Sequence, residues 1–425
     1  AEKPLAIAVE RDKGHVSVRR TCIHGTPDMA EADYRYVERY VKFLLWSIGG
    51  FRVYICGNDP IAARLAKDYA VDGARAFDFD FFHKLYKRDL EVIALPLDKC
   101  PEPNEAPMPI GGHMDGCRIG FDAGGSDRKV SAVIDGKCVY SEEVVWHPKT
   151  QADPTYHYNE IVEAFRTAAS KMPRVDAIGV SSAGTFIGNA PMIASLFIKV
   201  PRSRWDEVET IYDRAGAAIG DVPVVVANDG DVTALAGAMS MDVGSIMGIA
   251  MGTSEAVGYV DEKGNITGWL NELAFMPVDV NPDAMEDEWS GDIGCGVKYF
   301  SQDGVIKLAP RAGINLSESL SPAEKLKEVQ KLMDQDGNNA AEIYRSIGTY
   351  LGHALAYYYD LYHCRHVLLL GRVMSGKGGD LVLEEAKRVL ADEYPECSGK
   401  LFPALPDEKS RRVGQSVAAA SLPEV

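Results

Sequence analysis

Residues 120–126 read Gly-Phe-Asp-Ala-Gly-Gly-Ser and end an apolar, strand-like run. They place a carboxylate, two glycines and a hydroxyl within one tight turn. A polyphosphate needs backbone N–H groups close by, and residues without a Cβ let the backbone approach it. The stretch therefore predicts a phosphate-binding turn, although a lone copy of it is also typical of an ordinary surface hairpin.

A second loop of this kind, Met251-Gly252-Thr253-Ser254, follows the apolar run 246–250. Two strand-ended loops that each combine glycine with a hydroxyl predict a nucleotide held between two lobes. A third glycine-rich stretch, residues 371–379, follows the predicted strand 367–370. This stretch is as typical of a tight connection between a strand and a helix as it is of a ligand-binding loop. If it binds ligand, it is the third loop that faces the nucleotide.

Acidic side chains accompany these loops. Asp122 lies beside the first loop, where a carboxylate can hold Mg2+ through its water shell. The predicted strand 222–227 ends in Asn228-Asp229-Gly230-Asp231, and open α/β sheets bind ligands at the carboxyl ends of their strands. A carboxylate there can accept the proton of an attacking hydroxyl, which contributes roughly 10² to 10⁴ in rate.

The alternative role for these carboxylates is to cap the helix predicted over residues 232–240. We assign the cap to Asp231 and the role of general base to Asp229.

Length and composition limit the function classes. With 425 residues the chain exceeds one ordinary core and predicts two or three domains. A net charge of -17 argues against nucleic acid, which requires clustered Lys and Arg. The apolar runs fall short of the ~18 residues that a membrane helix needs. Eight scattered cysteines without a Cys-x-x-Cys pair indicate a reduced, cytoplasmic setting.

The segment before residue 110 predicts an α/β region of its own. Runs 5–10 and 15–20 alternate around Asp12-Lys13-Gly14, which is typical of a hairpin. A helical pattern over 30–48 ends at Gly49-Gly50, and a strand follows. Prolines gather over 96–109, so we place a domain boundary there. Further α/β elements are predicted at 119–140 (a hairpin with its turn at 135–136), 158–171, 177–180, 204–218, 222–227 and 341–362.

Taken in order, these motifs resemble the sugar kinase, actin and Hsp70 superfamily, and within it the ROK family (repressors, open reading frames and sugar kinases). The resemblance covers about residues 117–425. Asp122-Ala-Gly-Gly-Ser126 is similar to the family's first phosphate loop, and Met251-Gly-Thr-Ser-Glu255 is similar to its second. Residues 371–379 resemble the family's adenosine loop, and Asn228-Asp229 resembles its catalytic Asn-Asp pair. Residues 268–279 resemble the Gly-Glu-x-Gly-His segment.

The resemblance implies an α/β, two-lobed actin-like ATPase (ribonuclease H-like) fold with an additional N-terminal α/β region. The expected parts are the extension 1–112, lobe I at 113–231 plus about 410–425, and lobe II at 232–409. ATP and Mg2+ are the implied cofactors, with Asp122 holding Mg2+ through water. The implied nucleotide contacts are Asp122, Gly124, Gly125, Ser126, Gly252, Thr253, Ser254, Gly371, Ser375 and Gly376, and the implied substrate contacts are Asn228, Glu272, Gly184 and Ser195.

The chain departs from the family pattern in the substrate half of the site. The family histidine, a zinc ligand that also touches sugar, is Phe275 here. The zinc motif has shrunk to Asp292-Ile-Gly-Cys295-Gly, and one cysteine cannot build a zinc site. We therefore expect no zinc. Ser195 stands where the family usually has an asparagine, so the pocket is expected to be remodelled relative to ordinary hexose kinases.

The expected function is ATP-dependent phosphorylation of a sugar or sugar-like hydroxyl, with Asp229 as the base. Two alternatives are a non-catalytic sugar- or nucleotide-responsive regulator and a pseudo-kinase of the same fold. ROK repressors carry a DNA-binding module before the kinase-like part, but the hairpin and strand signals before residue 110 do not resemble a helix-turn-helix. The expected partners are a small sugar-like substrate and ATP, with neither nucleic acid nor membrane. The sequence leaves open whether the chain forms a homodimer.

Overall fold

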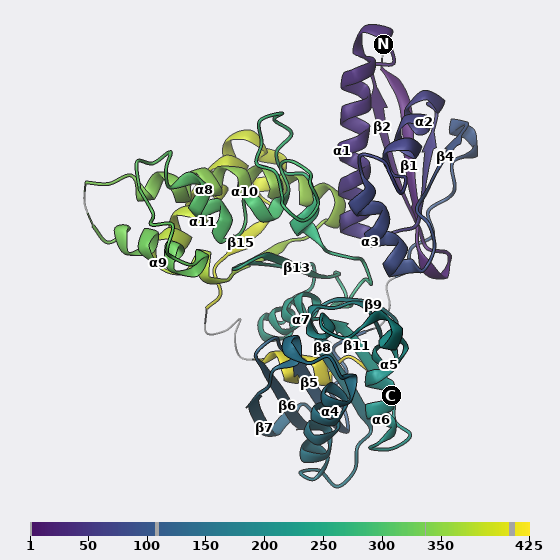
Figure 1. The fold of residues 1–425 in the computed structure, drawn as a ribbon, viewed down its shortest axis with the longest axis vertical. Coiled ribbons are helices and arrows are strands. Elements are labelled where there is room, and N and C mark those ends of the chain that lie inside the picture. The colour runs from purple at the N-terminus through teal and green to yellow at the C-terminus, as the bar shows by residue number, and fades with distance from the viewer. Residues whose placement is uncertain (1, 107–109, 336, 408–412) are drawn as a thin grey trace.

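The computed structural model describes residues 2–106, 110–335, 337–407 and 413–425. Figure 1 shows three parts, which we call the N-terminal region (residues 2–106), lobe I (residues 110–228 and 413–425) and lobe II (residues 229–407). Each part has its own main sheet. In the described ranges, no helix is long and apolar enough to cross a membrane.

The N-terminal region is a four-stranded sheet in the order β2-β1-β3-β4 with three helices. The predicted hairpin is confirmed, because β1 and β2 pair antiparallel around the 3-10 turn η1 (Asp12–Gly14). The predicted long helix is also confirmed, and it ends at Gly49, whose φ of 84° suits glycine. The elements are β1 (Lys3–Glu10), β2 (Val16–Ile23), α1 (Ala30–Ile48), β3 (Arg52–Cys56), α2 (Asp59–Asp68), α3 (Ala76–Tyr86) and β4 (Glu91–Leu95).

Lobe I is a five-stranded sheet in the order β11-β8-β5-β6-β7. Strands β11, β8 and β5 run parallel, so the polar residues that end β5 and β11 lie at one edge. The single helix predicted over 204–218 is wrong, because Thr210 separates two shorter helices. The elements are β5 (Cys117–Ala123), β6 (Asp127–Ile134), β7 (Lys137–Val145), α4 (Pro154–Ala169), β8 (Ala177–Ser182), β9 (Thr185–Ile187), β10 (Ala190–Ile193), α5 (Trp205–Glu209), α6 (Ile211–Ala217), β11 (Val224–Asn228) and α13 (Gln415–Ala420).

The C-terminal helix α13 packs directly on this sheet, as Figure 1 shows in yellow. A Cβ on Gly120 or Gly179 would collide with the backbone carbonyl oxygens of Ser416 and Ala419, respectively. Gly120, the first residue of the turn sequence, therefore serves helix packing rather than phosphate binding.

Lobe II is a four-stranded sheet in the order β13-β12-β14-β15, covered by long helices. The boundary expected between residues 231 and 232 falls inside its first helix, α7. The elements are α7 (Asp229–Met241), β12 (Ile246–Met251), β13 (Glu255–Val260), α8 (Gln302–Leu308), α9 (Pro322–Leu332), α10 (Ala340–Tyr362), β14 (His366–Leu370), α11 (Lys377–Glu393), α12 (Pro395–Ser398) and β15 (Phe402–Ala404).

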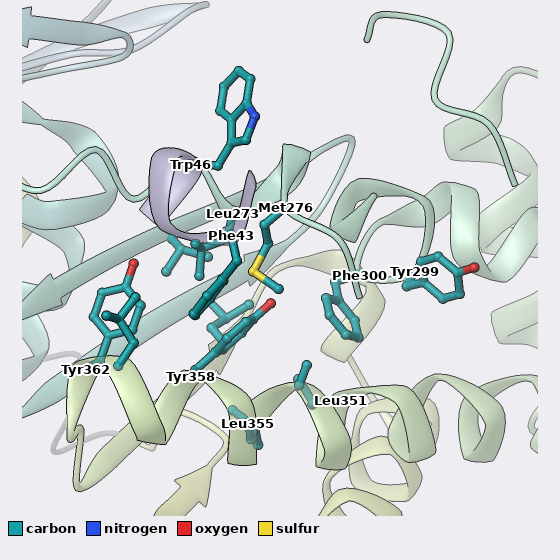
Figure 2. Packing of buried hydrophobic residues seen from close by; sticks show 14 of the residues in the cluster. Phe43, Trp46, Leu273, Met276, Tyr299, Phe300, Leu351, Leu355, Tyr358 and Tyr362 are labelled. Carbon is teal, nitrogen blue, oxygen red and sulfur yellow. The ribbon is translucent and has the colours of Figure 1, made fainter. Parts of the chain in front are cut away.

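The N-terminal region shares a hydrophobic core with lobe II. Figure 2 shows Phe43 of α1 pointing toward Met276 and Tyr358 of lobe II. The carbonyls of Trp46, Ser47 and Ile48 accept hydrogen bonds of 3.0 to 3.2 Å from the backbone N–H groups of residues 272, 271 and 270, respectively. The last carbonyls of a helix have no partner within the helix. Residues 270–272 therefore supply the missing partners at the end of α1 and fasten the N-terminal region to lobe II.

Candidate active site

The proposed base lies at the junction of β11 and α7. Asn228 caps α7, since its Oδ1 accepts a 2.7 Å hydrogen bond from the Gly230 N–H. Its Nδ2 donates to the carbonyl of Gly184 over 2.8 Å, so Asn228 and Gly184, two of the four predicted substrate residues, lie side by side. The prediction that Asp231 caps this helix is wrong, because α7 begins at Asp229, three residues before the expected start.

Asp231 instead lies buried in the first turn of α7, facing other segments of lobe II. Its Oδ1 accepts hydrogen bonds from the Tyr259 N–H (3.1 Å) and the Asn271 side chain (2.8 Å). Burial, with a smaller contribution from the charge of Asp229, raises the pKa of Asp231 to about 7 against these bonds. This carboxyl is thus a structural neighbour of the proposed base.

Asp229 and Asp122 are partly buried carboxyls that repel each other across the strand ends. Burial raises the pKa of Asp229, and the charge of Lys149 opposes this shift. Burial and the charge of Asp229 raise the pKa of Asp122 to about 6, against a 3.0 Å hydrogen bond from the Ser181 hydroxyl. A carboxylate whose pKa is raised toward neutrality is suited to accept a proton.

Gln415 of α13 links these two carboxyl positions. Its side-chain amide donates to the Ser181 hydroxyl (2.8 Å) and to the backbone carbonyl of Asp229 (3.1 Å). The C-terminal helix therefore connects the backbone of Asp229 with the hydroxyl that binds the Asp122 carboxyl. The sequence gives no local signal for this contact, because Gln415 lies far along the chain from both acids.

The first predicted phosphate loop is the turn between β5 and β6. Trp146 secures it by donating from its indole to the carbonyl of Gly124 (2.8 Å) and from its backbone N–H to that of Ser126 (3.1 Å). Lys149 extends over Gly125, where a Cβ would lie 2.9 Å from its Nζ. A cation thus lies across this loop and also acts electrostatically on Asp229, a feature that sequence reasoning missed.

The second and third predicted loops meet in lobe II. Gly252, Thr253 and Ser254 form the turn between β12 and β13. Gly371 has a φ of 94°, and a Cβ there would collide with the backbone of Met251. The neighbouring Arg372 donates to the Thr253 hydroxyl over 2.7 Å. Ser375 and Gly376 then precede the N-terminus of α11, a site that favours anions.

Glu272 lies among other acids rather than beside a cation. Burial, followed by the charges of Asp229 and Asp231, raises its pKa to about 7. Within the described residues no ion pair involves Glu272. Ser195 behaves differently from the other predicted substrate residues, because it lies exposed at the start of the 3-10 helix η5 (Ser195–Phe197), and no hydrogen bond of its side chain to them is found in the described chain.

Phe275, in place of the family histidine, packs against the N-terminal region. Its ring centroid lies 4.6 Å from that of Trp46 and 5.3 Å from that of Phe77. An aromatic residue at this position therefore serves the interface between the two parts.

Asp292, in the shortened zinc motif, lies in a buried ion-pair network with the N-terminal region. It pairs with Lys42 (2.6 Å), Arg39 (2.9 Å) and Arg75 (2.6 Å). Although burial opposes ionisation, these cations hold the pKa of Asp292 well below its usual range. In the part of the chain that the structure describes, no three His, Cys, Asp or Glu side chains form a group suited to a metal.

A cavity of about 220 Å³ opens beside Asn228 and Asp231. Its walls come from lobe I, from lobe II and from the N-terminal region. The residues that line it are Arg11, Asp12, Lys13, His15, Leu85, Tyr86, Ile110, residues 184–189, residues 225–228, Asp231, Ile266 and residues 268–270. Of the predicted substrate residues, Asn228 and Gly184 are part of this lining, and Glu272 and Ser195 are not.

The order of these loops and acids agrees with a sequence comparison, in which residues 118–417 match the model of the ROK family. The chain belongs to the ROK family. No curated protein matches this ROK sequence closely enough to add to the comparison.

Solved structures show the same two-lobed, actin-like fold. A ROK hexokinase from Thermus thermophilus aligns with a TM-score of 0.55 and 17% identity, covering 72% of this chain and 97% of that chain. A ROK family glucokinase from Streptomyces griseus, solved with glucose and AMPPNP, aligns with a TM-score of 0.50 and 20% identity, covering 72% and 98%. A ROK family protein from Streptococcus pneumoniae, solved with sucrose, aligns with a TM-score of 0.51 and 11% identity, covering 72% and 96%.

Proposed function

We propose that this ROK protein transfers the γ-phosphoryl group of ATP to a hydroxyl of a sugar or sugar-like compound. The observation that carries this proposal is the position of Asp229, a carboxyl of raised pKa at the carboxyl end of β11, directly after the cavity residue Asn228 and within electrostatic reach of Asp122 and Lys149. The solved glucokinase with glucose and AMPPNP, which shares the fold, supports the same chemistry.

In this proposal, ATP lies between the lobes with its phosphates on the loops at residues 124–126 and 252–254. The oxygen of the acceptor hydroxyl attacks the γ-phosphorus while Asp229 accepts the proton of that hydroxyl. ADP leaves with the bridging oxygen. Lys149 neutralises charge on the transferred group, since such transfer depends on positioning and charge stabilisation. Closure of the lobes excludes water that would otherwise accept the phosphoryl group.

Asp122 fits a role in holding Mg2+. Its carboxyl is repelled by Asp229 and Asp127, and a cation nearby would relieve that repulsion. Mg2+ usually keeps several waters and takes one or two carboxylates together with phosphate oxygens. When bound with ATP, it would neutralise phosphate charge.

For the substrate, we propose that Asn228, Gly184 and Glu272 contact the acceptor. Ser195 is exposed and has the least structural support of the four predicted substrate residues. Glu272 lies among acids and therefore needs a donor, which a sugar hydroxyl can supply.

One form of the regulator alternative, a repressor that carries a DNA-binding module as ROK repressors do, would require the N-terminal region to bind DNA. A β-sheet with three α-helices supports a role other than DNA binding for that region. We propose that the N-terminal region packs on the kinase-like lobes as an appendage. A screen tests the kinase against this alternative: neutral, amino and acidic sugars are incubated with Mg-ATP, and ADP formation and thermal stabilisation are measured. Sugar-dependent ADP formation supports the kinase, whereas stabilisation by a sugar without any turnover favours the regulator.

A further inference from the structure

The carboxyl of Asp231 lies on the wall of the cavity beside Asn228, and the proposed mechanism gives it no role. This residue is only 5% exposed, although it lines the cavity. A Cβ on Gly258 would lie 2.0 Å from the carbonyl oxygen of Gly230, so β13 packs directly against the first turn of α7. This close packing fixes the backbone that carries Asp231.

Lobe II holds one of the two oxygens of this carboxyl. The Tyr259 N–H and the Asn271 side chain both donate to Oδ1. Oδ2 makes no hydrogen bond in the described chain, and no ion pair involves Asp231 there. A carboxyl this deeply buried needs donors for its oxygens. Oδ2 is therefore the atom of this side chain that is available to a ligand in the cavity.

The orientation of Asn271 is fixed from two sides. Its backbone N–H donates to the carbonyl of Ser47 at the end of α1 (3.0 Å), and its φ of 54° is one that Asn tolerates. The hydroxyl of Tyr362 donates to its Oδ1 over 2.9 Å, which directs its Nδ2 toward Asp231. Asn271 therefore positions the Asp231 carboxyl, with support from the N-terminal region and from α10.

The polar side chains that lobe I contributes to this cavity are already hydrogen-bonded within the protein. Asn228 and Asn189 each donate from Nδ2 and accept at Oδ1. The hydroxyl of Thr185 donates to a backbone carbonyl over 3.5 Å. In contrast to these three side chains, Asp231 presents an oxygen that no described residue uses.

Trp269 supplies an aromatic wall of the same cavity. Its ring centroid lies 6.4 Å from that of Tyr259, at an interplanar angle of 26°, and 5.2 Å from that of Tyr362. The two tyrosines that support Trp269 also support Asp231 and its partner Asn271. Small-molecule sites commonly combine such an aromatic wall with a few polar anchors. A sugar ring can lie against this wall while one of its polar groups reaches Asp231.

Asp231 and Asp229 serve different parts of the substrate. They are two residues apart on α7, which separates their side chains by about 200° around the helix axis. Asp229 lies within electrostatic reach of Asp122 and Lys149, beside the first predicted phosphate loop. The group that Asp231 binds is therefore distinct from the hydroxyl whose proton Asp229 accepts.

We infer that Asp231 is a further substrate-binding residue, whose Oδ2 accepts a hydrogen bond from a hydroxyl or amino group of the substrate other than the attacked hydroxyl. Asn271 is its positioning residue. This inference rests on the proposed function and extends it to a group that the substrate must carry.

The test measures binding rather than turnover, in a full-length parent chain that carries Asp229→Asn. D-glucose, D-glucosamine and the monodeoxy analogues of D-glucose are titrated against thermal stability at about pH 8, above the pKa of the Asp231 carboxyl. Asp231→Asn is then added to the parent chain, because Asn keeps an oxygen for the two bonds from lobe II and replaces Oδ2 by an NH2 group. Asp242→Asn, the same change at the exposed far end of α7, is the control.

We expect D-glucose or D-glucosamine to stabilise the parent chain, and Asp231→Asn to weaken that binding about fivefold or more, because hydrogen bonds to a carboxylate are roughly twice as strong as neutral ones. Asp242→Asn should leave the binding unchanged. The deoxy analogue that lacks the contacted group should bind the parent and Asp231→Asn chains alike. A preference for D-glucosamine that Asp231→Asn abolishes identifies the group as an amine.

Equal binding of sugar by the Asp231→Asn and Asp242→Asn chains overturns the inference. A loss in Asp231→Asn that is the same for D-glucose and for every deoxy analogue also overturns it, because a purely structural role predicts such a uniform loss. If neither sugar binds the parent chain, the sugar acceptor of the proposed function fails, and the inference fails with it. Because Asp229→Asn is already present, these outcomes are separate from failure of the proposed catalysis.

Discussion

Glu255 follows the second predicted phosphate loop and is a buried carboxyl whose two oxygens have no hydrogen-bond partner among the described residues. Burial, and then the charge of Glu272, raises its pKa from 4.5 to about 8. The folded state therefore holds the protonated form at a pH where the unfolded chain is ionised. Replacement by Gln keeps the shape and removes the titration.

The sign and size of the effect follow from linkage. A carboxyl whose folded pKa is raised loses its contribution to stability as pH rises from the unfolded pKa to the folded one. Each pKa unit corresponds to about 1.4 kcal/mol, so between pH 5 and pH 9 wild type should lose about 4 kcal/mol more free energy of unfolding than Glu255→Gln. The other raised carboxyls titrate in both proteins and largely cancel in the comparison.

The assay is urea unfolding of both proteins at pH 5, 7 and 9, with the free energy of unfolding extrapolated to water. Glu262→Gln, at an exposed position, is the matched control and should follow wild type. A difference between wild type and Glu255→Gln that stays constant within about 1 kcal/mol across this range would refute the reasoning.

Three further predictions concern the site and its support. Glu272→Gln should lower kcat/KM for the acceptor at least tenfold, about 1.4 kcal/mol of transition-state stabilisation, and unchanged steady-state kinetics would remove Glu272 from the substrate site. Lys149→Met should lower kcat at least tenfold with little change in acceptor KM, and an effect on acceptor KM alone would contradict a role at the transferred phosphoryl group. Lys42→Met leaves Asp292 with only its two arginine partners and should cost about 3 kcal/mol in urea unfolding, so a loss below about 1 kcal/mol would argue against the importance of this network.

Much of the fold could be predicted because its signals are local. The alternation around Asp12-Lys13-Gly14 and the glycine after residue 48 specify the first hairpin and α1. The glycine and hydroxyl loops follow strands as expected, and the family resemblance, confirmed over residues 118–417, sets their order.

What the sequence could not predict depends on contacts between distant segments. Asn228 and Asp231 are both good helix caps, and only the point where β11 ends decides between them. Lys149 meets Gly125 through tertiary packing, and Phe275 turns to Trp46 because the N-terminal region docks there. The predicted roles of the site residues remain predictions, and so do the domain boundaries.

The most direct test of the central claim is phosphoryl transfer by Asp229→Asn, measured as transfer of label from γ-³²P-ATP to the acceptor found in the screen. The control is Asp242→Asn at the other end of α7, a left-handed position that Asn tolerates well. The account predicts a loss of at least 10²-fold in kcat for Asp229→Asn with ATP affinity retained, and near wild-type transfer for the control. Transfer by Asp229→Asn within a fewfold of wild type would contradict Asp229 as the base.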